Sequence, residues 1–460
     1  MYFNFHFIFL LIYKSFIYAK KFHSYQILPS FNQNLKERFN LRYLNEENRK
    51  NKINLNLTKE NLYFFEIEIG TPTQTVSVLL DTGSNYLWIN SNNCLDCKSK
   101  MKFISDNSKT FNKTNKLMNI NYISGTLKGI ISSDIIKFNN GSDNINISNF
   151  NFILINESSL NFELDGIFGL SKNIKDINNY HLSPLNQIYE NNIYDKNIFI
   201  LDFQNNNLFI GDKPSYLDLY HNITCKRKSI YDLNNYYWKC NTKKIKSNNI
   251  WFHSEMNNIV FNSGINSIVF SLDYIDFFKD IIPNNKLLNN AKCEIKKTQE
   301  NEQIYSLNCE NFDILLTNKE NNEYLKLYEE DFISIYFDYK EDSISFKIRD
   351  LYDKYTKNFK LYFIEIPNNT IIAGTPLFEK HIIMLDKDAE EIIIYKNKKD
   401  IRFSGFYNID IFSKISLIII VISIFLILIY YIIKRRKTKY NSIKLEKDFS
   451  KFGLFNQEGA

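Results

Sequence analysis

Short runs of apolar and aromatic residues, separated by Asn, Asp, Gly and Ser, recur along the middle of the chain. Residues 150–154 (Phe-Asn-Phe-Ile-Leu) and 198–203 (Ile-Phe-Ile-Leu-Asp-Phe) are typical of them. Runs of this length between turn-forming residues favour β-strands over helices. With 460 residues, the chain is long enough to bury two substantial cores. The pattern therefore predicts an all-β body made of many short strands.

Residues 415–433 are an apolar run of a different kind, with nineteen consecutive uncharged residues that are mostly Ile and Leu. As a helix they would span roughly 28 Å, about the thickness of the hydrocarbon core of a bilayer. Four basic residues, 434–437, follow directly, and basic flanks favour the cytosolic side. The run predicts one C-terminal transmembrane helix and a cytosolic tail, residues 434–460. The alternative is a buried helix of a soluble protein.

The start of the chain predicts export. Residues 5–19 are apolar and end in Ile17-Tyr18-Ala19, which suits cleavage after Ala19. This signal peptide, residues 1–19, is imperfect because Lys14 interrupts it and no positive residue precedes the apolar run. Residues 20–60 are basic and Asn-rich without a strong strand pattern, which suits a propeptide or a solvated linker. Together, both ends of the chain predict a single-pass type I protein of the secretory pathway or cell surface, with its body luminal or extracellular.

One sequence motif occurs in each half of the predicted β body. Asp81-Thr82-Gly83-Ser84 follows the apolar residues 76–80, and about 180 residues later Asn262-Ser263-Gly264-Ile265 follows residues 259–261. Two such glycine turns facing each other would hold two side chains a hydrogen bond apart. Two neighbouring carboxyls share one proton and act as acid and base toward a trapped water. In this chain the second carboxylate is an amide.

The motifs around these two turns resemble, in family order, those of the pepsin-like aspartic peptidases, which include the cathepsin D and plasmepsin types. The resemblance runs from about Tyr63 to Tyr395, and its joint specificity is high although each motif alone is weak. The segments that carry it are residues 63–74 with the Gly-Thr-Pro turn, Leu87-Trp88-Ile89, residues 108–111, the flap-like hairpin 122–129, Asp165-Gly166-Ile167-Phe168-Gly169-Leu170, residues 372–378 and Leu385-Asp386.

This resemblance implies an all-β, bilobal pepsin-like fold, with two β lobes around a central peptide-sized cleft. The N-terminal lobe would comprise residues 61–213 and the C-terminal lobe residues 214–405, as two halves of a diverged duplication. The third part of the predicted fold is the transmembrane helix at residues 415–433.

The resemblance also implies the candidate catalytic residues. Asp81 matches the first catalytic Asp, and Asn262 stands at the position of the second. The residues that would support this pair are Thr82, Gly83, Ser84, Ser263 and Gly264. Ile265 stands where the family has a hydroxyl that bonds to the carboxylate. The two positions that depart from the family pattern, Asn262 and Ile265, are therefore both positions that take part in the reaction in the family. The alternative for Asp81 is an ordinary turn aspartate.

A hairpin that would close over substrate is implied by residues 122–129. Tyr122 occupies the flap tyrosine position and would bond toward Trp88, while Ile123 stands where the family usually has Gly and Ser124 follows. The substrate-binding residues are therefore predicted as Tyr122, Ile123, Ser124 and Trp88. The alternative for both aromatic side chains is ordinary core packing.

Six cysteines lie between the leader and the apolar C-terminal run. Paired in sequence order they would close three local loops, and an oxidising compartment would follow. The alternative is a redox or zinc site at the first Cys-x-x-Cys, which supplies only half of a zinc site. The cysteines are Cys94, Cys97, Cys225, Cys240, Cys293 and Cys309.

The formal net charge of +6 is spread along the chain without a basic helix or stripe. With no nucleic-acid motif, the lysines are interpreted as solvated surface and no DNA or RNA partner is predicted. The six histidines are scattered, and no motif points to a metal or another cofactor. The predicted partners are an extended peptide or protein and the membrane.

Three functions are compatible with this sequence. The first is a pseudopeptidase that binds an extended peptide through backbone hydrogen bonds and side-chain pockets, with hydrolysis impaired or lost because of Asn262. The second is an acid endopeptidase in which Asn262 is repaired by deamidation, bypassed or tolerated. The third is a luminal or surface structural protein that reuses the scaffold without a ligand.

Overall fold

The structure is a computed structural model, and it describes most of the chain from residue 52 to residue 396. The described ranges are 52–122, 124–140, 143–172, 177–191, 193–226, 236–247, 250–298, 303–317, 322–337, 342–367 and 369–396, with residues 430, 434 and 435. The predicted signal peptide and nearly all of the predicted transmembrane segment lie outside these ranges. Within them, no helix has the length and apolar character needed to cross a bilayer.

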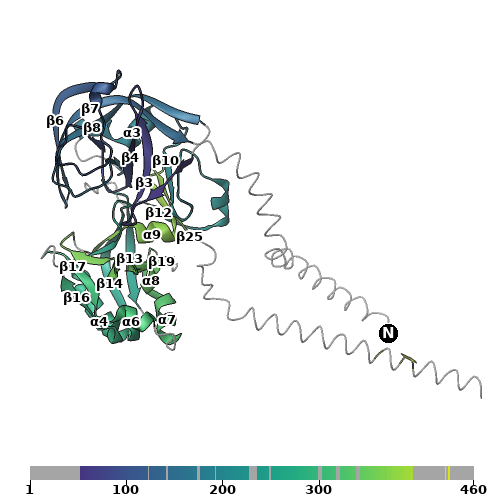
Figure 1. Ribbon diagram of the computed structural model, residues 1–460. Helices are drawn as coiled ribbons and strands as arrows, with labels where there is room; N and C mark the ends of the chain where they lie inside the picture. Colours follow the sequence, from purple (N-terminus) through teal and green to yellow (C-terminus); the bar gives the residue numbers. More distant parts are fainter. Residues whose placement is uncertain are drawn as a thin grey trace, which may run out of the picture. The chain divides into compact units, whose positions relative to one another are not determined.

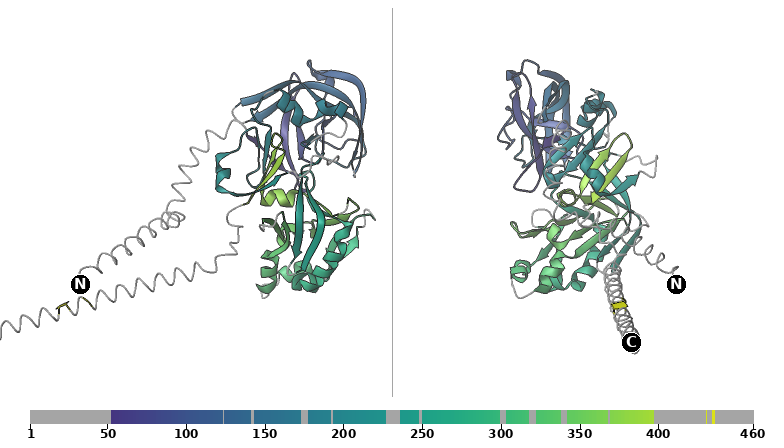
Figure 2. Two further views of the ribbon diagram at one scale, coloured as in Figure 1. Left: turned by 180° about the vertical axis from the view of Figure 1, so that it is seen from behind. Right: turned by 90° about the vertical axis from the view of Figure 1, so that its right-hand side faces the viewer.

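The chain divides into two compact units, Met1–Lys398 and Lys399–Ala460. All described strands and all buried hydrophobic clusters belong to the first unit, between Lys52 and Lys396. The described hydrophobic core therefore lies within this unit. Figures 1 and 2 show its two lobes from three directions.

The first half of the unit forms an eight-stranded sheet in the order β2-β3-β4-β9-β5-β8-β7-β6. In β3, Tyr63, Phe65, Ile67 and Ile69 are buried and alternate with more exposed residues, as expected for a strand with one face on the core. The strands are β2 (Asn56–Leu57), β3 (Tyr63–Ile69), β4 (Gln74–Asp81), β5 (Leu87–Asn90), β6 (Asn112–Tyr122), β7 (Gly125–Asn140), β8 (Asp143–Ser158) and β9 (Gly166–Gly169).

The second half forms a nine-stranded sheet in the order β16-β17-β22-β15-β23-β14-β13-β18-β19. Both sheets contain parallel pairs, between β4 and β9 in the first and between β14 and β23 in the second. The strands are β13 (Lys239–Ser247), β14 (Ile250–Phe261), β15 (Ile268–Ser271), β16 (Cys293–Lys297), β17 (Tyr305–Cys309), β18 (Asp331–Tyr336), β19 (Ser343–Lys347), β22 (Leu361–Ile364) and β23 (Thr370–Ala373).

A six-stranded sheet, in the order β1-β11-β10-β24-β25-β12, combines strands from both halves. Its edge strand β1 lies in the segment that the sequence assigns to a propeptide or linker, and Ile53 is paired with Leu208 of β11. Two more strands, β20 (Tyr352–Asp353) and β21 (Asn358–Phe359), form a separate pair. The six strands are β1 (Lys52–Asn54), β10 (Ile198–Asp202), β11 (Asn207–Ile210), β12 (His221–Lys226), β24 (Ile382–Asp386) and β25 (Glu391–Lys396).

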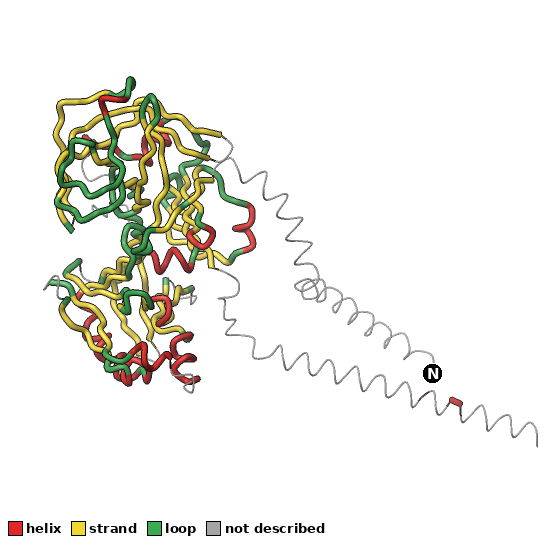
Figure 3. The backbone as a smooth tube through the Cα atoms, viewed as in Figure 1, coloured by secondary structure: helices red, strands yellow, loops and turns green. Residues whose placement is uncertain are grey.

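Most helices belong to the lobe formed by the second half, as the red segments of Figure 3 show. In α4, Phe277, Phe278, Ile281 and Ile282 are buried at helical spacing on one face. The α-helices are α3 (Pro184–Glu190), α4 (Ile275–Asn284), α5 (Lys286–Asn290), α6 (Phe312–Thr317), α7 (Asn322–Glu329), α8 (Ile348–Leu351) and α9 (Thr375–Lys380). The 3-10 helices are η1 (Ser105–Asn107), η2 (Ile177–Leu182), η3 (Phe203–Asn205), η4 (Ser215–Leu219) and η5 (Leu272–Tyr274).

The six cysteines form three disulfides, so the prediction of disulfides is confirmed and the zinc alternative for the first pair is wrong. The bonds join neighbours in the sequence: Cys94 with Cys97, Cys225 with Cys240, and Cys293 with Cys309. The third disulfide joins residues that lie directly opposite each other on the paired strands β16 and β17.

His381, between α9 and β24, is only 1 % exposed, and neither ring nitrogen has a hydrogen-bond partner within the described residues. Burial, with smaller contributions from Lys380 and Lys396, lowers the pKa of His381 well below its ordinary value of 6.5. The unfolded chain therefore binds a proton at this site more readily than the folded protein does. We expect this contribution to stability to be complete above about pH 6.5 and to fall as the pH drops toward the folded pKa.

Urea unfolding of the protein and of His381→Leu at a series of pH values tests this expectation. The substitution should flatten the loss of stability between neutral and mildly acidic pH, because Leu has a similar size and no titrating group. An unchanged pH dependence in His381→Leu would assign the acid sensitivity to other groups.

Candidate functional site

Asp81 is the last residue of β4, and a neighbouring strand fixes its position. The parallel strand β9 pairs Asp81 with Gly169, and the backbone N–H of Leu170 donates to the carbonyl oxygen of Asp81 at 2.8 Å. On its other side β9 pairs with the antiparallel strand β5. Because β9 lies between β4 and β5, it holds the loop at residues 82–86, which joins the end of β4 to the start of β5.

Asn262 follows β14 in the same arrangement. The parallel strand β23 pairs Phe261 with Ala373, and the backbone N–H of Asn262 donates to the carbonyl oxygen of Ala373 at 3.0 Å. On its other side β23 pairs with the antiparallel strand β15. The two halves therefore present residues 81 and 262 from equivalent positions of two equivalent strand arrangements.

Reciprocal hydrogen bonds join the two loops. The backbone N–H of Thr82 donates to Oγ of Ser263 at 3.1 Å, and the backbone N–H of Ser263 donates to Oγ1 of Thr82 at 3.0 Å. Each hydroxyl donates in turn to a carbonyl oxygen of the opposite strand, Thr82 to Phe261 at 2.9 Å and Ser263 to Leu80 at 2.6 Å. Both side chains are fully buried, so breaking one bond would leave unpaired polar groups away from water.

The acid and the amide are held in the same way. The backbone N–H of Gly83 donates to Oδ1 of Asp81 at 2.8 Å, and that of Gly264 donates to Oδ1 of Asn262 at 2.9 Å. A Cβ atom on Gly83 would lie 2.4 Å from Nδ2 of Asn262, and one on Gly264 would lie 2.4 Å from Oδ1 of Asp81. Each side chain therefore packs against the opposite glycine, and only glycine leaves room for it.

Asp81 is buried, with 7 % of the residue exposed. Burial raises its pKa above the ordinary value, while polar contacts from the Ser84 hydroxyl and the backbone N–H groups of Gly83 and Gly264 act in the opposite direction. Oγ of Ser84 lies near this carboxyl without forming a hydrogen bond of normal geometry to any described residue. A neutral amide at residue 262 adds no like charge to this balance.

The residue after each glycine differs between the two loops. Ser84 brings a hydroxyl close to the first carboxyl, whereas Ile265, the corresponding residue of the second loop, has a hydrocarbon side chain. The loop at Ile265 is nevertheless held in place, because its carbonyl oxygen accepts the backbone N–H of Thr375 at 2.8 Å. The loop backbones are alike, and the side chains at residues 84 and 265 are not.

Tyr122 and Trp88 lie next to this pair. The indole N–H of Trp88 donates to the hydroxyl oxygen of Tyr122 at 3.0 Å. Burial raises the pKa of Tyr122, and the charge of Asp81 is the next cause, which places the phenol within electrostatic reach of the carboxyl. Trp88 is 1 % exposed and packs in a hydrophobic cluster. It is thus a core residue that also orients Tyr122.

The structure brings together most of the predicted site residues, but not all of them. Ser124 is exposed beside the turn between β6 and β7. Ile123 lies outside the described residues. Those brought together are Asp81, Thr82, Gly83, Ser84, Asn262, Ser263, Gly264, Trp88 and Tyr122.

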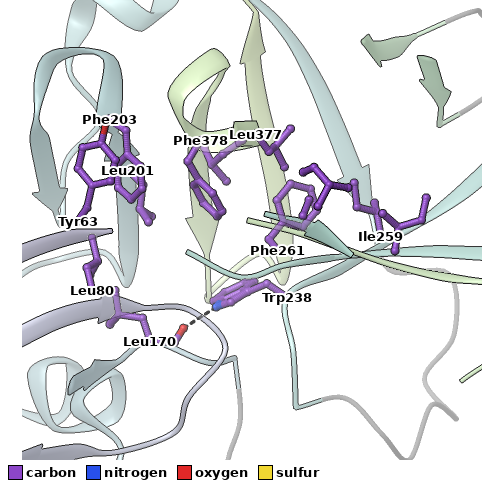
Figure 4. Packing of buried hydrophobic residues seen from close by; sticks show 14 of the residues in the cluster. Tyr63, Leu80, Leu170, Leu201, Phe203, Trp238, Ile259, Phe261, Leu377 and Phe378 are labelled. Carbon is purple, nitrogen blue, oxygen red and sulfur yellow. Dashed lines mark hydrogen bonds between the residues drawn. The ribbon is translucent and has the colours of Figure 1, made fainter. Parts of the chain in front are cut away.

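Trp238 is a residue of this region that the sequence analysis did not single out. Its indole N–H donates to the carbonyl oxygen of Leu170 at 2.7 Å, and its own carbonyl oxygen accepts the N–H of Phe261 at 2.9 Å. Figure 4 shows it between Leu170 and Phe261. It therefore ties the strand before Asn262 to the segment behind Asp81. No local pattern around Trp238 marks this role.

Within the described residues no cluster of three or more His, Cys, Asp or Glu side chains could hold a metal ion. The polar groups of the site are instead one carboxyl, one carboxamide, hydroxyls and backbone N–H groups. This set suits hydrogen bonding to a peptide backbone.

Residues 62–322 match the model of a family described as eukaryotic aspartyl protease, over more than half of the chain. The chain is 40 % identical to aspartic protease 6 of Caenorhabditis elegans over 114 residues, which are 24 % of this chain and 29 % of the relative. It is 32 % identical to vacuolar protease A of Neurospora crassa over 182 residues, 37 % of this chain and 45 % of the relative. It is 37 % identical to plasmepsin I of Plasmodium falciparum over 90 residues, which are 19 % of this chain and 20 % of the relative. The aligned parts cover less than half of each relative.

Proposed function

Because the chain belongs to the eukaryotic aspartyl protease family, we propose that it binds an extended peptide and hydrolyses peptide bonds poorly or not at all. One observation carries the proposal: Gly264 holds the amide of Asn262 in the way that Gly83 holds the carboxyl of Asp81. The scaffold that would hold two acids is kept, and one acid is missing.

The proposed impairment follows from the lack of a titratable carboxyl group at residue 262. Peptide hydrolysis by two carboxyls requires one to take a proton from water while the other gives a proton to the substrate. The amide of Asn262 does neither in the working pH range. General acid–base catalysis is worth roughly a hundred- to ten-thousand-fold, and groups that act as a unit lose more when one is removed.

Deamidation of Asn262 would restore the acid, and the contacts of its loop argue against it. Deamidation requires the backbone nitrogen of Ser263 to attack the side-chain carbon of Asn262. That N–H donates to Oγ1 of Thr82 at 3.0 Å, and Oδ1 of Asn262 accepts from Gly264 at 2.9 Å. Both reacting groups are thereby held, which supports an Asn that remains an amide.

The second candidate function is an active acid endopeptidase. It is favoured by the intact surroundings of Asp81, since its Gly83 contact and the Thr82–Ser263 bonds are all present. It requires a proton donor other than Asn262. The third candidate, a scaffold protein without a ligand, requires that substitutions around Tyr122 change no binding.

We place the protein in the lumen of the secretory pathway or at the cell surface. Three disulfides support an oxidising compartment, and the name of one relative, vacuolar protease A, is consistent with it. Membrane anchoring through residues 415–433 is part of the proposal and rests on the sequence.

Peptide capture tests the proposed binding. The protein and Tyr122→Ala would be incubated with a library of ten-residue peptides at acidic and neutral pH, and retained peptides would be identified by mass spectrometry. We expect retained peptides at full length, with affinities about tenfold or more weaker in Tyr122→Ala, as for loss of a buried aromatic contact.

The control is Tyr355→Ala, because Tyr355 is 97 % exposed on a turn of the other half. It should leave capture unchanged. No captured peptide, or equal capture by Tyr122→Ala and the unaltered protein, would favour the scaffold function instead.

A further inference from the structure

Two large apolar side chains stand out from the loop between β5 and β6. Leu95 is 92 % exposed and Met101 is 58 % exposed. Both belong to residues 94–104, here called the basic loop. Single exposed apolar residues are common on protein surfaces, but two on one short loop among lysines form a pattern that the proposed function does not use.

The basic loop is held rigidly, so these side chains cannot fold inward. The disulfide between Cys94 and Cys97 closes the turn that carries Leu95. Phe103 is fully buried, and its N–H donates to the carbonyl oxygen of Asn90 at 2.8 Å. Oδ1 of Asp165 accepts the N–H of Met101 at 3.0 Å. The fold itself therefore presents Leu95 and Met101 to the outside.

The loop carries three lysines and, between Cys94 and Ile104, one aspartate. Nζ of Lys98 donates to the amide oxygen of Asn161 at 3.0 Å, and Nζ of Lys102 donates to the carbonyl oxygen of Cys94 at 2.6 Å. Both acceptors are neutral, so neither bond cancels the charge. Among the described residues, no carboxylate forms an ion pair with these two lysines or with Lys100.

We propose that the basic loop docks on an anionic lipid bilayer, with Leu95 and Met101 entering the boundary of the acyl chains and the three lysines contacting headgroup phosphates. A bilayer accepts an apolar tip without a shaped pocket, and ammonium groups on long stems suit its diffuse charge. These properties favour a lipid surface over an acidic protein, which would need a complementary partner surface.

The chain also provides a reason for the folded unit to stay near a membrane. The apolar run at residues 415–433 begins nineteen residues after Lys396, the last residue of β25. Docking does not involve Asp81 or Asn262, so the inference stands apart from the proposed function.

Vesicle flotation tests the docking with residues 52–398 of the first unit, a segment that omits both the basic residues before 52 and the apolar run. Three intact disulfides and a cooperative unfolding transition would first show that the unit is folded. We expect binding to vesicles of phosphatidylcholine with phosphatidylserine to exceed binding to phosphatidylcholine alone on the order of a hundredfold, for three lysines near the surface. High salt should reduce this preference.

Matched substitutions separate the loop from general charge effects. Leu95→Asp should weaken vesicle binding about tenfold or more, whereas Leu117→Asp should not, because Leu117 is a similarly exposed residue of β6 at 81 %. The double variant Lys98→Ala/Lys100→Ala should lower the preference for anionic vesicles. The control double variant Lys113→Ala/Lys116→Ala should leave that preference unchanged. Equal binding to both vesicle types, or equal loss in the two Leu variants, would overturn the proposal.

Discussion

Asn262→Asp is expected to raise the rate of peptide-bond hydrolysis by roughly a hundred- to ten-thousand-fold at acidic pH. The new carboxyl would face Asp81 across the two glycine contacts, because Gly264 already donates to Oδ1 of residue 262 at 2.9 Å. Two adjacent carboxyls cannot both ionise easily, so the pair would hold one proton between its two apparent pKa values. Activity should therefore appear within an acidic window. The measurement is cleavage of a peptide library followed by mass spectrometry.

Two controls limit the interpretation of this gain. Asn266→Asp adds the same charge four residues further along and should add no activity, since Nδ2 of Asn266 bonds to the carbonyl oxygen of Glu60 instead of joining the pair. Asp81→Ala combined with Asn262→Asp should be silent. If Asn262→Asp folds and captures peptides but cleaves none, the amide is not the group that limits hydrolysis, and Ile265 becomes the next position to change.

Trp238→Ala is expected to destabilise the protein by about 3–5 kcal/mol, the range for removing a large buried aromatic side chain. Trp238 is 1 % exposed, and Figure 4 shows its indole bonded to Leu170 within the shared hydrophobic cluster. Its loss leaves both a cavity and an unpaired carbonyl oxygen. Because Leu170 also bonds to the backbone of Asp81, the damage should reach the candidate site. Urea unfolding measures the free energy.

The matched control is Trp251→Ala. Trp251 is 37 % exposed on the surface of β14, where its contacts include Lys244, Lys246 and Tyr336. Its removal should cost no more than about 1 kcal/mol, as for exposed cation–π contacts. A loss as large as that of Trp238→Ala, or a loss below 1 kcal/mol for Trp238→Ala itself, would contradict a joining role for Trp238.

The family and the mainly β fold could be predicted because the motifs depend on particular residue types at fixed places. Gly83 and Gly264 must be glycine, since each faces the opposite side chain at contact distance. The predicted strand at residues 150–154 lies inside β8. The one at 198–203 is β10, and Phe203 already begins a 3-10 turn. Turn-forming residues around apolar runs were sufficient for these elements.

The helices of the second half were not predicted, although α4 carries a signal for them. Phe277, Phe278, Ile281 and Ile282 have helical spacing, but the run was not set apart from the strand-like segments around it. Other features had no local signal. The strand β1 has three residues and is stabilised by β11, far along the chain, and the partner of Trp238 is Leu170, 68 residues earlier.

Within the candidate site, the sequence predicted that the loops at Asp81 and Asn262 differ in their side chains. The structure showed that the backbones of the two loops are nevertheless held in the same way. The resemblance alone implied that Thr82 and Ser263 support the pair. Only the structure shows the hydrogen bond that the Ser263 N–H donates to Thr82, which argues against deamidation. The sequence thus identified Asn262 as the changed residue, and the structure supplied the contacts that argue against its deamidation.

Incubation of the unaltered protein with a diverse peptide library at acidic pH, beside Asp81→Ala, tests the central claim most directly. Mass spectrometry would count the cleaved peptides. We predict no cleavage above the level of Asp81→Ala, because Asn262 cannot supply the second acid. Cleavage by the unaltered protein that Asp81→Ala abolishes would contradict this account and would make the protein a working acid endopeptidase.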